Sequence, residues 1–321
     1  MIAVAGENVV DLVPAGGTPD TYRALAGGSP ANIAIAATRL GTPAALIARI
    51  GSDAFGHRVR ERLAADGISP RYLVDAPEPS SLAVVSFDEQ RRASYDFWFT
   101  GTADGQWAGH ELPDPLDPDI RALHVGSAAL HLEPGGAALL RMILREHARG
   151  AVTLTLDPNV RPDISGDLGP VRRRLEAVMP LCDVVKASDE DLRHLYPDLD
   201  PVEAGRLWRD SGPSLVVVTQ GPDGATAILE HEAIAVASPE VDVADTVGAG
   251  DAFMGALLHG LATRDLLGGD QVGALRTIAP EELRRVLEYA AAAAAYTCTR
   301  PGADPPTSKA LAGWLAERSE A

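Results

Sequence analysis

Short apolar runs alternate along the chain with longer segments that have a helical period. The apolar runs are IAVAG, AALIARIG, ALHVG, AVTLTLDPN, CDVVKAS and SLVVVTQG, and their nearly continuous apolar character is typical of strands covered on both faces. Segments such as PANIAIAATRLG, FGHRVRERLAADG and GGAALLRMILREHARG lie between them and predict helices. This order predicts an α/β fold with a mostly parallel central sheet flanked by helices.

Two stretches depart from the alternation and predict a small β lid. SLAVVSFDEQRRASYDFWF contains two strand-like runs around the polar tip DEQRR, as expected for a hairpin. Residues 11–25 are short and rich in Pro and Gly. Because a hairpin that covers nothing is marginally stable, we expect both stretches to pack on something. The predicted organisation is one domain over 1–321 with a lid inserted from about 12–25 and 81–107.

Composition and charge narrow the function classes. The 321 residues, 46% of them hydrophobic, suffice for a large core. With 28 Lys and Arg against 45 Asp and Glu, the net charge of −17 disfavours nucleic acid and anionic membranes as partners. The start MIAVAGENVV does not resemble a signal peptide, and no apolar run approaches the about 20 residues that span a bilayer. We therefore expect a globular, cytoplasmic protein.

Cysteine and histidine give no sign of a metal site. Cys182 and Cys298 lie far apart and fit no CxxC pattern, so we expect two buried thiols. The eight histidines show neither an HxH nor an HExxH spacing. Neither residue type predicts a zinc site.

The stretch DTVGAGDAFMG, residues 245–255, is the first candidate for chemistry. It precedes a helical pattern, so the amides of Gly248, Ala249 and Gly250 are expected at a helix N-terminus, where the helix dipole favours an anion. Asp251 follows them, and a carboxylate is an unprotonated base at neutral pH. The alternative is a glycine-rich helix start with Asp251 as a first-turn acidic residue. The motif by itself leaves both open.

The stretch AGGSPANIAIAATRLG is the second candidate. Gly27 and Gly28 predict a turn, followed by Ser29 as a helix N-cap and Pro30 at the first helical position. Asn32 falls in the first turn, where its amide can bridge two hydroxyls of a ligand. The alternative is an ordinary surface asparagine at a helix start.

Together the two stretches resemble the two signatures of the ribokinase-like, or PfkB, carbohydrate kinase family. The first runs from Gly27 through Asn32 and Gly41 to Gly51 and continues into GSDAFG, and the second is DTVGAGDAFMG. The resemblance covers essentially the whole chain. It implies a ribokinase-like, doubly wound fold and a kinase that uses ATP and Mg²⁺ to phosphorylate a sugar hydroxyl.

The resemblance also implies roles for individual residues. Asp251 corresponds to the catalytic base, and the amides of Gly248, Ala249 and Gly250 correspond to the anion hole for the charge that grows during transfer. On the sugar side, the matching residues are Asp11, Gly27, Gly28 and Asn32. The alternative for Asp11 is a turn residue at a strand end.

The nucleotide side resembles the family in VVVTQGPDGA and in VVKASDED. The implied nucleotide-binding residues are Lys186, Ser188, Thr219, Gly221, Gly224, Gly248 and Gly250. The six-alanine run 290–295 resembles the helix beside adenine, although the sequence favours an alanine-rich core helix. TQGPDG alone is also an ordinary turn.

The metal ligands are where the chain departs from the family pattern. Many members carry Asn-x-x-Glu near the magnesium water shell, and here Ser188 and Asp191 stand at those positions. The shorter Asp191 is therefore expected to act on Mg²⁺ at most indirectly. The resemblance also implies a K⁺ site formed by carbonyls around Asp245 and Val247 and by the TRPGA turn.

Two segments bear on which sugar is bound. DPNVRP resembles the D-x-N-x-R segment of fructokinases and 2-keto-3-deoxygluconate kinases. In it, Arg161 either binds a substrate carboxylate, contacts phosphate and hydroxyls, or is solvated, and Asp157 and Asn159 orient it or line the nucleotide side. YDFWFTGTAD resembles the lid strand of fructokinase-like members.

Strand alternation in the lid puts Phe97 and Phe99 on one face and Trp98 on the other. We expect the first face to cover the sugar and exclude water, and the second to pair with another copy of the chain in a homodimer.

These observations favour an ATP-dependent sugar kinase that converts fructose to fructose 6-phosphate. A 2-keto-3-deoxygluconate kinase is the alternative within the class, followed by a ribokinase or a nucleoside kinase. From another class, a sugar-binding regulator without turnover shares the same fold.

Overall fold

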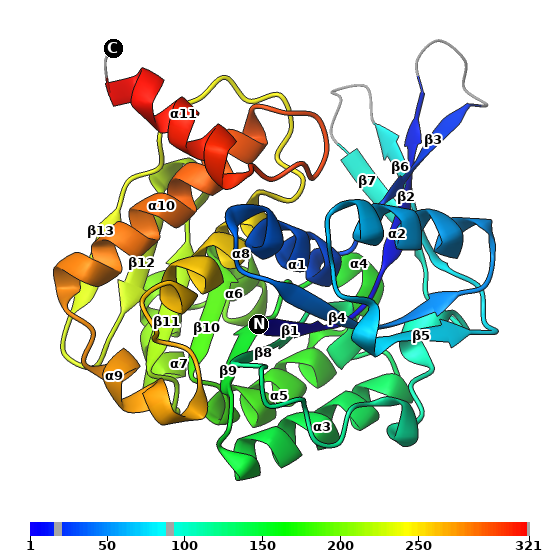
Figure 1. Ribbon diagram of the computed structural model, residues 1–321, viewed down its shortest axis with the longest axis horizontal. Helices are drawn as coiled ribbons and strands as arrows, with labels where there is room; N and C mark the ends of the chain where they lie inside the picture. Colours follow the sequence, from blue (N-terminus) through cyan, green and yellow to red (C-terminus); the bar gives the residue numbers. More distant parts are fainter. Residues whose placement is uncertain (16–20, 88–92, 320–321) are drawn as a thin grey trace.

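The computed structural model describes residues 1–15, 21–87 and 93–319, and within them a nine-stranded sheet forms the centre of the molecule (Figure 1). Its strands are β1 (Ile2–Ala5), β4 (Ala44–Gly51), β5 (Leu73–Ala76), β8 (Ala122–Gly126), β9 (Thr153–Asp157), β10 (Val184–Ser188), β11 (Leu215–Thr219), β12 (Ala225–Ile228) and β13 (Ala233–Val236). The strand order is β13-β12-β11-β10-β9-β8-β1-β4-β5. Every pair from β11 to β5 is parallel, and β12 is antiparallel to both of its neighbours.

Helices cover both faces of this sheet. One hydrophobic core lies under α1 (Ser29–Leu40), α2 (Ala54–Ala65), α8 (Ala249–Ala262), α9 (Val272–Arg276), α10 (Pro280–Cys298) and α11 (Ser308–Ser319). The other lies under α3 (Gly135–Arg149), α5 (Leu168–Val178), α6 (Asp189–Leu195) and α7 (Pro201–Asp210). Strand β1 shows the reason: Ile2 and Val4 join the first core, whereas Ala3 and Ala5 join the second. The predicted doubly wound α/β fold is confirmed.

A second, four-stranded sheet rises from one end of the main body (Figure 1). Its order is β3 (Tyr22–Ala26), β2 (Val9–Pro14), β6 (Ser81–Phe87) and β7 (Ala93–Trp98). The two stretches predicted to form a lid therefore meet, because β2 pairs parallel with β6 while β6 and β7 form the expected antiparallel hairpin. The predicted tip DEQRR, residues 88–92, lies outside the described residues.

The bounds of this sheet differ from the predicted 12–25 and 81–107. Pairing begins at Val9 and ends at Trp98. The chain beyond Trp98 returns to the main body, where Trp107 is buried in the core beside α3. Tertiary burial of one aromatic side chain thus ends the lid earlier than the local pattern indicated.

Asp104 fastens the base of the lid. Its Oδ1 accepts a hydrogen bond from the amide of Asn8, 2.7 Å away and just before β2, and its Oδ2 accepts one from the hydroxyl of Ser81, at the start of β6. That hydroxyl also contacts Thr102 Oγ1 at 2.7 Å. Burial raises the pKa of Asp104 to about 7. The Asp104 carboxyl group therefore joins the two points at which the chain enters the lid.

Helices α1 and α8 pack with their backbones close together. A methyl group on Gly255 of α8 would lie 2.5 Å from the Cβ of Ala36 and 2.8 Å from the carbonyl oxygen of Ile33, both in α1. Since neither of those atoms belongs to a flexible side chain, only glycine fits. This close approach brings the first turns of the two helices together at the candidate site.

Replacing Gly255 by alanine is expected to destabilise the protein by about 1–3 kcal/mol, because the helices must separate to admit the methyl group. Gly313, in α11, is the matched control because open space surrounds it. Gly313→Ala is expected to stabilise by up to about 1 kcal/mol through helix propensity. Urea unfolding of both variants measures the difference, and equal stabilities would contradict the close packing.

Candidate active site

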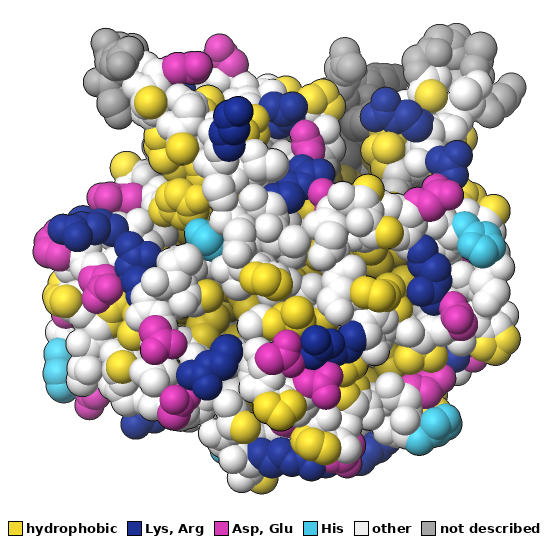
Figure 2. Space-filling view, in the orientation of Figure 1, with side chains coloured by type: hydrophobic (Ala, Val, Ile, Leu, Met, Phe, Trp, Pro, Cys, Tyr) yellow, Lys and Arg dark blue, Asp and Glu magenta, His cyan; other side chains and the backbone are white. Residues whose placement is uncertain are grey.

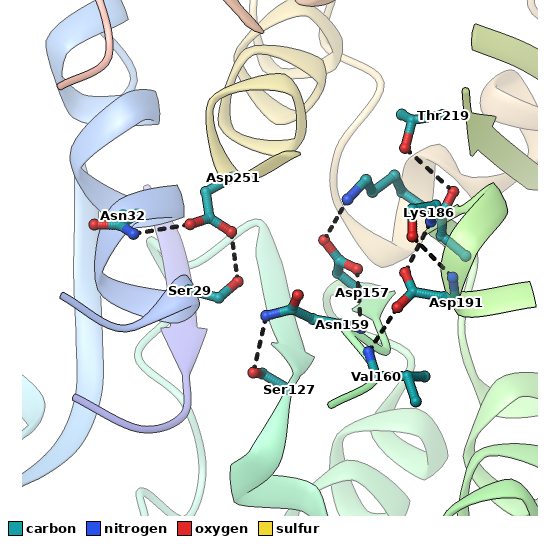
Figure 3. Close-up of polar contacts among 12 residues, drawn as sticks. Ser29, Asn32, Ser127, Asp157, Asn159, Val160, Lys186, Asp191, Thr219 and Asp251 are labelled. Carbon is teal, nitrogen blue, oxygen red and sulfur yellow. Dashed lines mark hydrogen bonds and ion pairs between the residues drawn. The ribbon is translucent and has the colours of Figure 1, made fainter. Parts of the chain in front are cut away.

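Polar side chains gather at the carboxyl ends of the parallel strands. Asp157 ends β9, Lys186 lies in β10, and Thr219 ends β11, while α8 begins on the opposite side of the same space (Figure 3). In open α/β sheets, ligands bind outside the carboxyl ends of the strands, near the point where the chain order reverses. Here that point is β1, whose neighbours are β4 and β8.

Asp251, in the first turn of α8, joins the two sequence motifs. Its Oδ1 accepts a hydrogen bond from Ser29 Oγ at 2.6 Å, and its Oδ2 accepts one from Asn32 Nδ2 at 2.8 Å (Figure 3). The prediction of Ser29 as N-cap is wrong. Gly28, with a φ of 101°, caps α1, so Ser29 is the first helical residue and its hydroxyl is directed to Asp251 instead.

The N-terminus of α8 offers backbone donors beside this carboxylate. Gly248 is the N-cap, in the left-handed region with a φ of 77°. Among the described residues, the amides of Gly248, Gly250 and Asp251 have no hydrogen-bond acceptor. The amide of Ala249 differs from the prediction, because it donates to the carbonyl of Thr246 at 3.2 Å. Two of the three predicted donors, and the amide of Asp251 in addition, are thus available to an anion.

A buried ion pair lies next to these amides. Lys186 Nζ and Asp157 Oδ2 are 2.8 Å apart, and both side chains are almost fully buried (Figure 3). A methyl group on Gly250 would lie 3.2 Å from Lys186 Nζ, which places the ammonium group beside the start of α8.

The electrostatic surroundings keep both members of this pair charged. Burial opposes the charge of Lys186, but the carboxylates of Asp157, Asp191 and Asp251 outweigh it and raise the pKa of the ammonium group. Burial raises the pKa of Asp157 to about 6, opposed by Lys186. At neutral pH the site therefore holds an ion pair. Asp157 thus contacts the lysine of the predicted nucleotide side.

Asp191 and Ser188 form a capping box at the start of α6. Ser188 Oγ accepts a hydrogen bond from the Asp191 amide at 3.0 Å, and Asp191 Oδ2 accepts one from the Ser188 amide at 2.9 Å. Asp191 Oδ1 accepts a third from the Val160 amide at 2.7 Å. Each carboxylate oxygen therefore already binds one amide. No group of three or more His, Cys, Asp or Glu residues placed to hold a metal occurs in the described part of the chain.

The loops after β8 and β9 meet in an unusual backbone conformation. Ser127 and Asn159 have φ values of 58° and 41°, and Asn159 Nδ2 donates to Ser127 Oγ at 3.1 Å (Figure 3). The Asn159 amide also donates to Asp157 Oδ1 at 3.3 Å. Asn159 thus positions the loop that carries Asp157.

On the predicted sugar side, Asp11 lies against the glycine turn. A methyl group on Gly27 would lie 2.5 Å from Asp11 Oδ2, so the backbone at Gly27 lies directly against the Asp11 carboxylate. Burial raises the pKa of Asp11 to about 6, opposed by Arg62 and reinforced by Asp251. Asp11 and Asp251 therefore share one space, with Gly28 and Asn32 beside them.

Asp11 should make sugar binding pH-dependent. Its raised pKa means that the carboxylate, the form that accepts sugar hydroxyls, is lost as the pH falls through about 6. We expect kcat/KM for the sugar to fall with decreasing pH in that range. Steady-state profiles of the wild type and Asp11→Asn measure this. The variant should have a lower plateau and lack this acidic limb, and an unchanged limb would assign it to another group.

The lid carries an aromatic ladder over the site. Tyr95 and Phe97 stack with ring centroids 5.8 Å apart, and Phe97 and Phe99 with centroids 5.9 Å apart. Trp98 lies on the opposite face and is 53% exposed. The predicted alternation is confirmed, although Phe99 is buried at the lid base against Val9.

Arg161 lies at the rim of the site, immediately before α4 (Pro162–Ser165). It is exposed, and its Nη1 donates to the carbonyl of Val160 at 3.1 Å. Burial raises the pKa of nearby Glu7, which is 3% exposed, and Arg161 is among the groups that oppose this rise. Burial also raises the pKa of Tyr95, and the charge of Arg161 opposes this rise as well. The arginine therefore faces a buried carboxyl group as well as the lid.

The turn between β11 and β12 holds the remaining predicted nucleotide residues. Thr219 Oγ1 donates to the carbonyl of Ala187 at 3.4 Å. Gly221 and Gly224 both have positive φ, but only Gly224 is packed, since a methyl group there would lie 2.0 Å from the carbonyl oxygen of Val236. The close contact with β13 is thus sufficient to require glycine at position 224. Open space surrounds Gly221, so packing does not require glycine there.

Asp245 connects the second motif to the TRPGA turn. Its Oδ1 accepts from the Val247 amide at 3.0 Å and its Oδ2 from the Gly302 amide at 2.7 Å. The alanine run of α10 is largely buried in the core, and α10 packs along α8. A core role therefore accounts for these alanines.

The sequence reasoning did not predict four residues that contribute here: Ser29 as a partner of the base, Glu7, Tyr95 and Ser127. The partners of Ser29, Glu7 and Ser127 lie far away along the chain. Two of the four residues had a local signal: Ser29 lies within the first motif, and Tyr95 opens the segment YDFWFTGTAD.

Comparison with known proteins decides the family. The model of the pfkB family carbohydrate kinase matches residues 1–310. The chain belongs to this family. A fructokinase from Rhizobium leguminosarum bv. trifolii is 36% identical over 277 residues, which cover 86% of this chain and 84% of the relative.

Solved structures of pfkB-type sugar kinases agree with this assignment. A fructokinase with bound ATP from Xylella fastidiosa superposes with a TM-score of 0.90 at 26% identity, covering 99% of this chain and 98% of the other. A fructokinase double mutant from Vibrio cholerae O395, solved with fructose, ADP and potassium ion, has a TM-score of 0.82 at 28% identity, covering 98% and 97%. The ribokinase-like fold is therefore shared over nearly the whole length.

Three further features bear on what the sequence predicted: the membrane-spanning potential of the helices, the distribution of surface charge and the state of the cysteines. Within residues 1–15, 21–87 and 93–319, no helix combines the length and apolar character needed to cross a membrane. The cytoplasmic location stays a prediction.

On the face seen in Figure 2, Lys and Arg side chains lie among Asp and Glu side chains rather than in one basic patch. Both cysteines are free, and Cys182 is buried as predicted, whereas Cys298 is only half-buried.

Proposed function

We propose that this chain is a fructokinase, an ATP-dependent kinase that phosphorylates the 6-hydroxyl of fructose. The observation that carries the proposal is the position of Asp251. It lies between polar side chains from the sugar motif, Ser29 and Asn32, and the unpaired amides at the start of α8. A base is thus placed between a hydroxyl-binding surface and an anion-binding surface. The fructokinase relatives, including those solved with ATP and with fructose and ADP, support the choice of substrates.

The geometry supports a direct transfer. Asp251 takes the proton of the attacking sugar hydroxyl, while Ser29 and Asn32 fix the direction of its two oxygens. The amides of Gly248 and Gly250 face the negative charge that grows on the phosphoryl group, and Lys186 adds a positive charge beside them. Bound ATP supplies the phosphoryl group, and bound Mg²⁺ neutralises phosphate charge.

The residues present fit a Mg²⁺ ion held chiefly by nucleotide phosphates and water. Mg²⁺ keeps several waters and uses few protein carboxylates in such sites, in keeping with the lack of a three-residue metal cluster among the described residues. Asp191 retains lone pairs for a water of this shell, although amides already fix both of its oxygens. For K⁺, the candidate ligands remain the carbonyls near Asp245 and Val247, and the Vibrio cholerae structure with potassium supports the idea.

The outer face of the lid is proposed to form a homodimer contact. Trp98 and Tyr22, on strands β7 and β3 of the lid, are 53% and 46% exposed. Large aromatic side chains on a small sheet gain stability when a partner buries them. A second copy of the chain supplies a matching aromatic face if the contact is symmetric.

A coupled assay of ADP release tests the substrate choice. Fructose, 2-keto-3-deoxygluconate, ribose and adenosine are each supplied with MgATP, and fructose is expected to give the highest kcat/KM. A preference for the acidic sugar would favour the alternative kinase. No release with any sugar would favour a sugar-binding regulator.

Arg161 discriminates between the neutral and the acidic sugar. If it binds a substrate carboxylate, Arg161→Ala should lower kcat/KM for 2-keto-3-deoxygluconate roughly 10–100-fold, the value of a charge-assisted hydrogen bond. The decrease in kcat/KM for a neutral sugar should be smaller. Equal losses for both sugars, measured in the same assay, would remove this role.

A further inference from the structure

Arg62, in the last turn of α2, reaches from outside the two motifs into the candidate site. Its guanidinium donates to Asn32 Oδ1 at 3.1 Å, to the carbonyl of Ala303 at 3.0 Å, and to the carbonyl of Ala26. These acceptors belong to three separate parts of the chain: α1, the loop after α10, and lid strand β3. A planar guanidinium with donors in a fixed fork suits such a junction.

The bond to Asn32 fixes the direction of its side-chain amide. A guanidinium only donates hydrogen bonds, so the oxygen of Asn32 must face Arg62. The NH₂ group of Asn32 then faces the other way, toward Asp251 Oδ2 at 2.8 Å. The Asp251 carboxylate, which only accepts, favours the same orientation, so Arg62 reinforces the donor that Asn32 presents to the catalytic carboxylate.

The other two bonds of Arg62 reach the lid and the loop after α10. Ala26 ends the lid strand β3 directly before the Gly27 turn, so its carbonyl ties the lid to α2. Ala303 packs against Gly248, where a methyl group would lie 2.5 Å from the Ala303 Cβ. The Arg62 side chain thus connects the lid with the loop that packs on the start of α8.

The charges around Arg62 are mostly opposite to its own. Asp66 faces it from the C-cap of α2, Asp11 from β2 and Asp251 from α8, whereas Arg39 on α1 repels it. Arg39 is itself bound to Asp66 at 2.6 Å and to Asp304 at 2.5 Å. Asp11 is faced by Arg62, by Asp251 and by the Tyr95 hydroxyl.

We propose that Arg62 is a positioning residue for sugar phosphorylation: it orients the Asn32 amide toward Asp251 and holds lid strand β3 and the loop at Ala303 around the sugar. This inference rests on the proposed function, because it takes Asp251 as the base. Arg62 also opposes the rise in the pKa of Asp11, so its charge has an effect separable from its geometry.

The test uses Arg62→Met, Arg62→Lys and, as matched control, Arg58→Met in the full chain. Arg58 lies one turn earlier on α2 and donates at 3.4 Å to the carbonyl of Ala24 in the same lid strand, but it is exposed. Fructose-dependent ADP release is measured from pH 5 to 9 at saturating MgATP, together with KM for ATP and the urea midpoint.

Both Arg62 variants should lose roughly 10–100-fold in kcat/KM for fructose, because neither side chain can supply three fixed donors. KM for ATP should stay unchanged. Only Arg62→Met should shift the acidic limb to higher pH, since Arg62→Lys keeps the charge near Asp11. Arg58→Met should match the wild type.

The inference is overturned if Arg62→Lys, the variant that best preserves folding, keeps the kcat/KM of the control. It is also overturned if the losses for fructose and for ATP are equal, which indicates a merely structural role. An inactive wild type would instead overturn the proposed function, and this inference with it.

Discussion

Replacing Asp251 by asparagine is expected to lower kcat with fructose roughly 10³-fold, within the range that a general base contributes. Asparagine keeps the size of the side chain and an oxygen for Ser29, but it cannot take the proton of the attacking hydroxyl. Fructose binding should persist, because Asp11 and the glycine turn are untouched. Single-turnover kinetics and calorimetric titration with fructose measure the two effects separately.

Asp200→Asn is the control for this variant. Asp200 caps α7 and accepts hydrogen bonds from the amides of Val202 and Glu203 in its own helix. Since asparagine is as good an N-cap as aspartate, this control should keep both its stability and its kcat. Turnover of Asp251→Asn close to that of the control would contradict the assignment of the base.

Lys186→Met should produce the second large effect, a loss of roughly 10²–10³-fold in kcat, as for removal of one preorganised donor to a developing charge. It should also destabilise the fold by about 3–5 kcal/mol at neutral pH, because Asp157 is left as an unpaired buried carboxylate. Because Lys186 opposes the rise in the pKa of Asp157 to about 6, its removal should raise that pKa further, so this loss should shrink as the pH falls toward about 6 and Asp157 of the variant takes up a proton. Urea unfolding at pH 5 and pH 8 measures the change.

The double variant Asp157→Asn/Lys186→Met separates activity from stability. Removing both charges should restore most of the lost stability, since no unpaired ion remains. Turnover should stay low, because the positive charge beside Gly250 is missing. Recovery of kcat in the double variant would show that the lysine acts only on the fold.

The fold was predictable because its signals are local. Ile2 and Val4 alternate with Ala3 and Ala5 in a fully buried strand, which predicts a sheet covered on both faces. The lid hairpin was visible for the same reason. Its end was not, since the burial of Trp107 depends on α3, a helix formed by residues further along the chain.

Part of the site was predictable from the sequence, because sequence motifs contain some of its residues. Asp251 and Asn32 were both identified, and the structure brings them to 2.8 Å from each other. Arg62 had no signal, because an arginine on an amphipathic helix is ordinary until its three acceptors are known. The N-cap prediction for Ser29 failed because Gly28, with a φ of 101°, takes the N-cap position, and the Ser29 hydroxyl donates to Asp251 instead.

The most direct measurement is phosphorus NMR of the product formed from fructose and MgATP by the wild type and by Asp251→Asn. The account predicts ADP and a single sugar phosphate, with the phosphorus coupled to the protons on carbon 6 of fructose, and essentially no product from the variant. Inorganic phosphate as the main product, or equal sugar phosphate from both proteins, would contradict it.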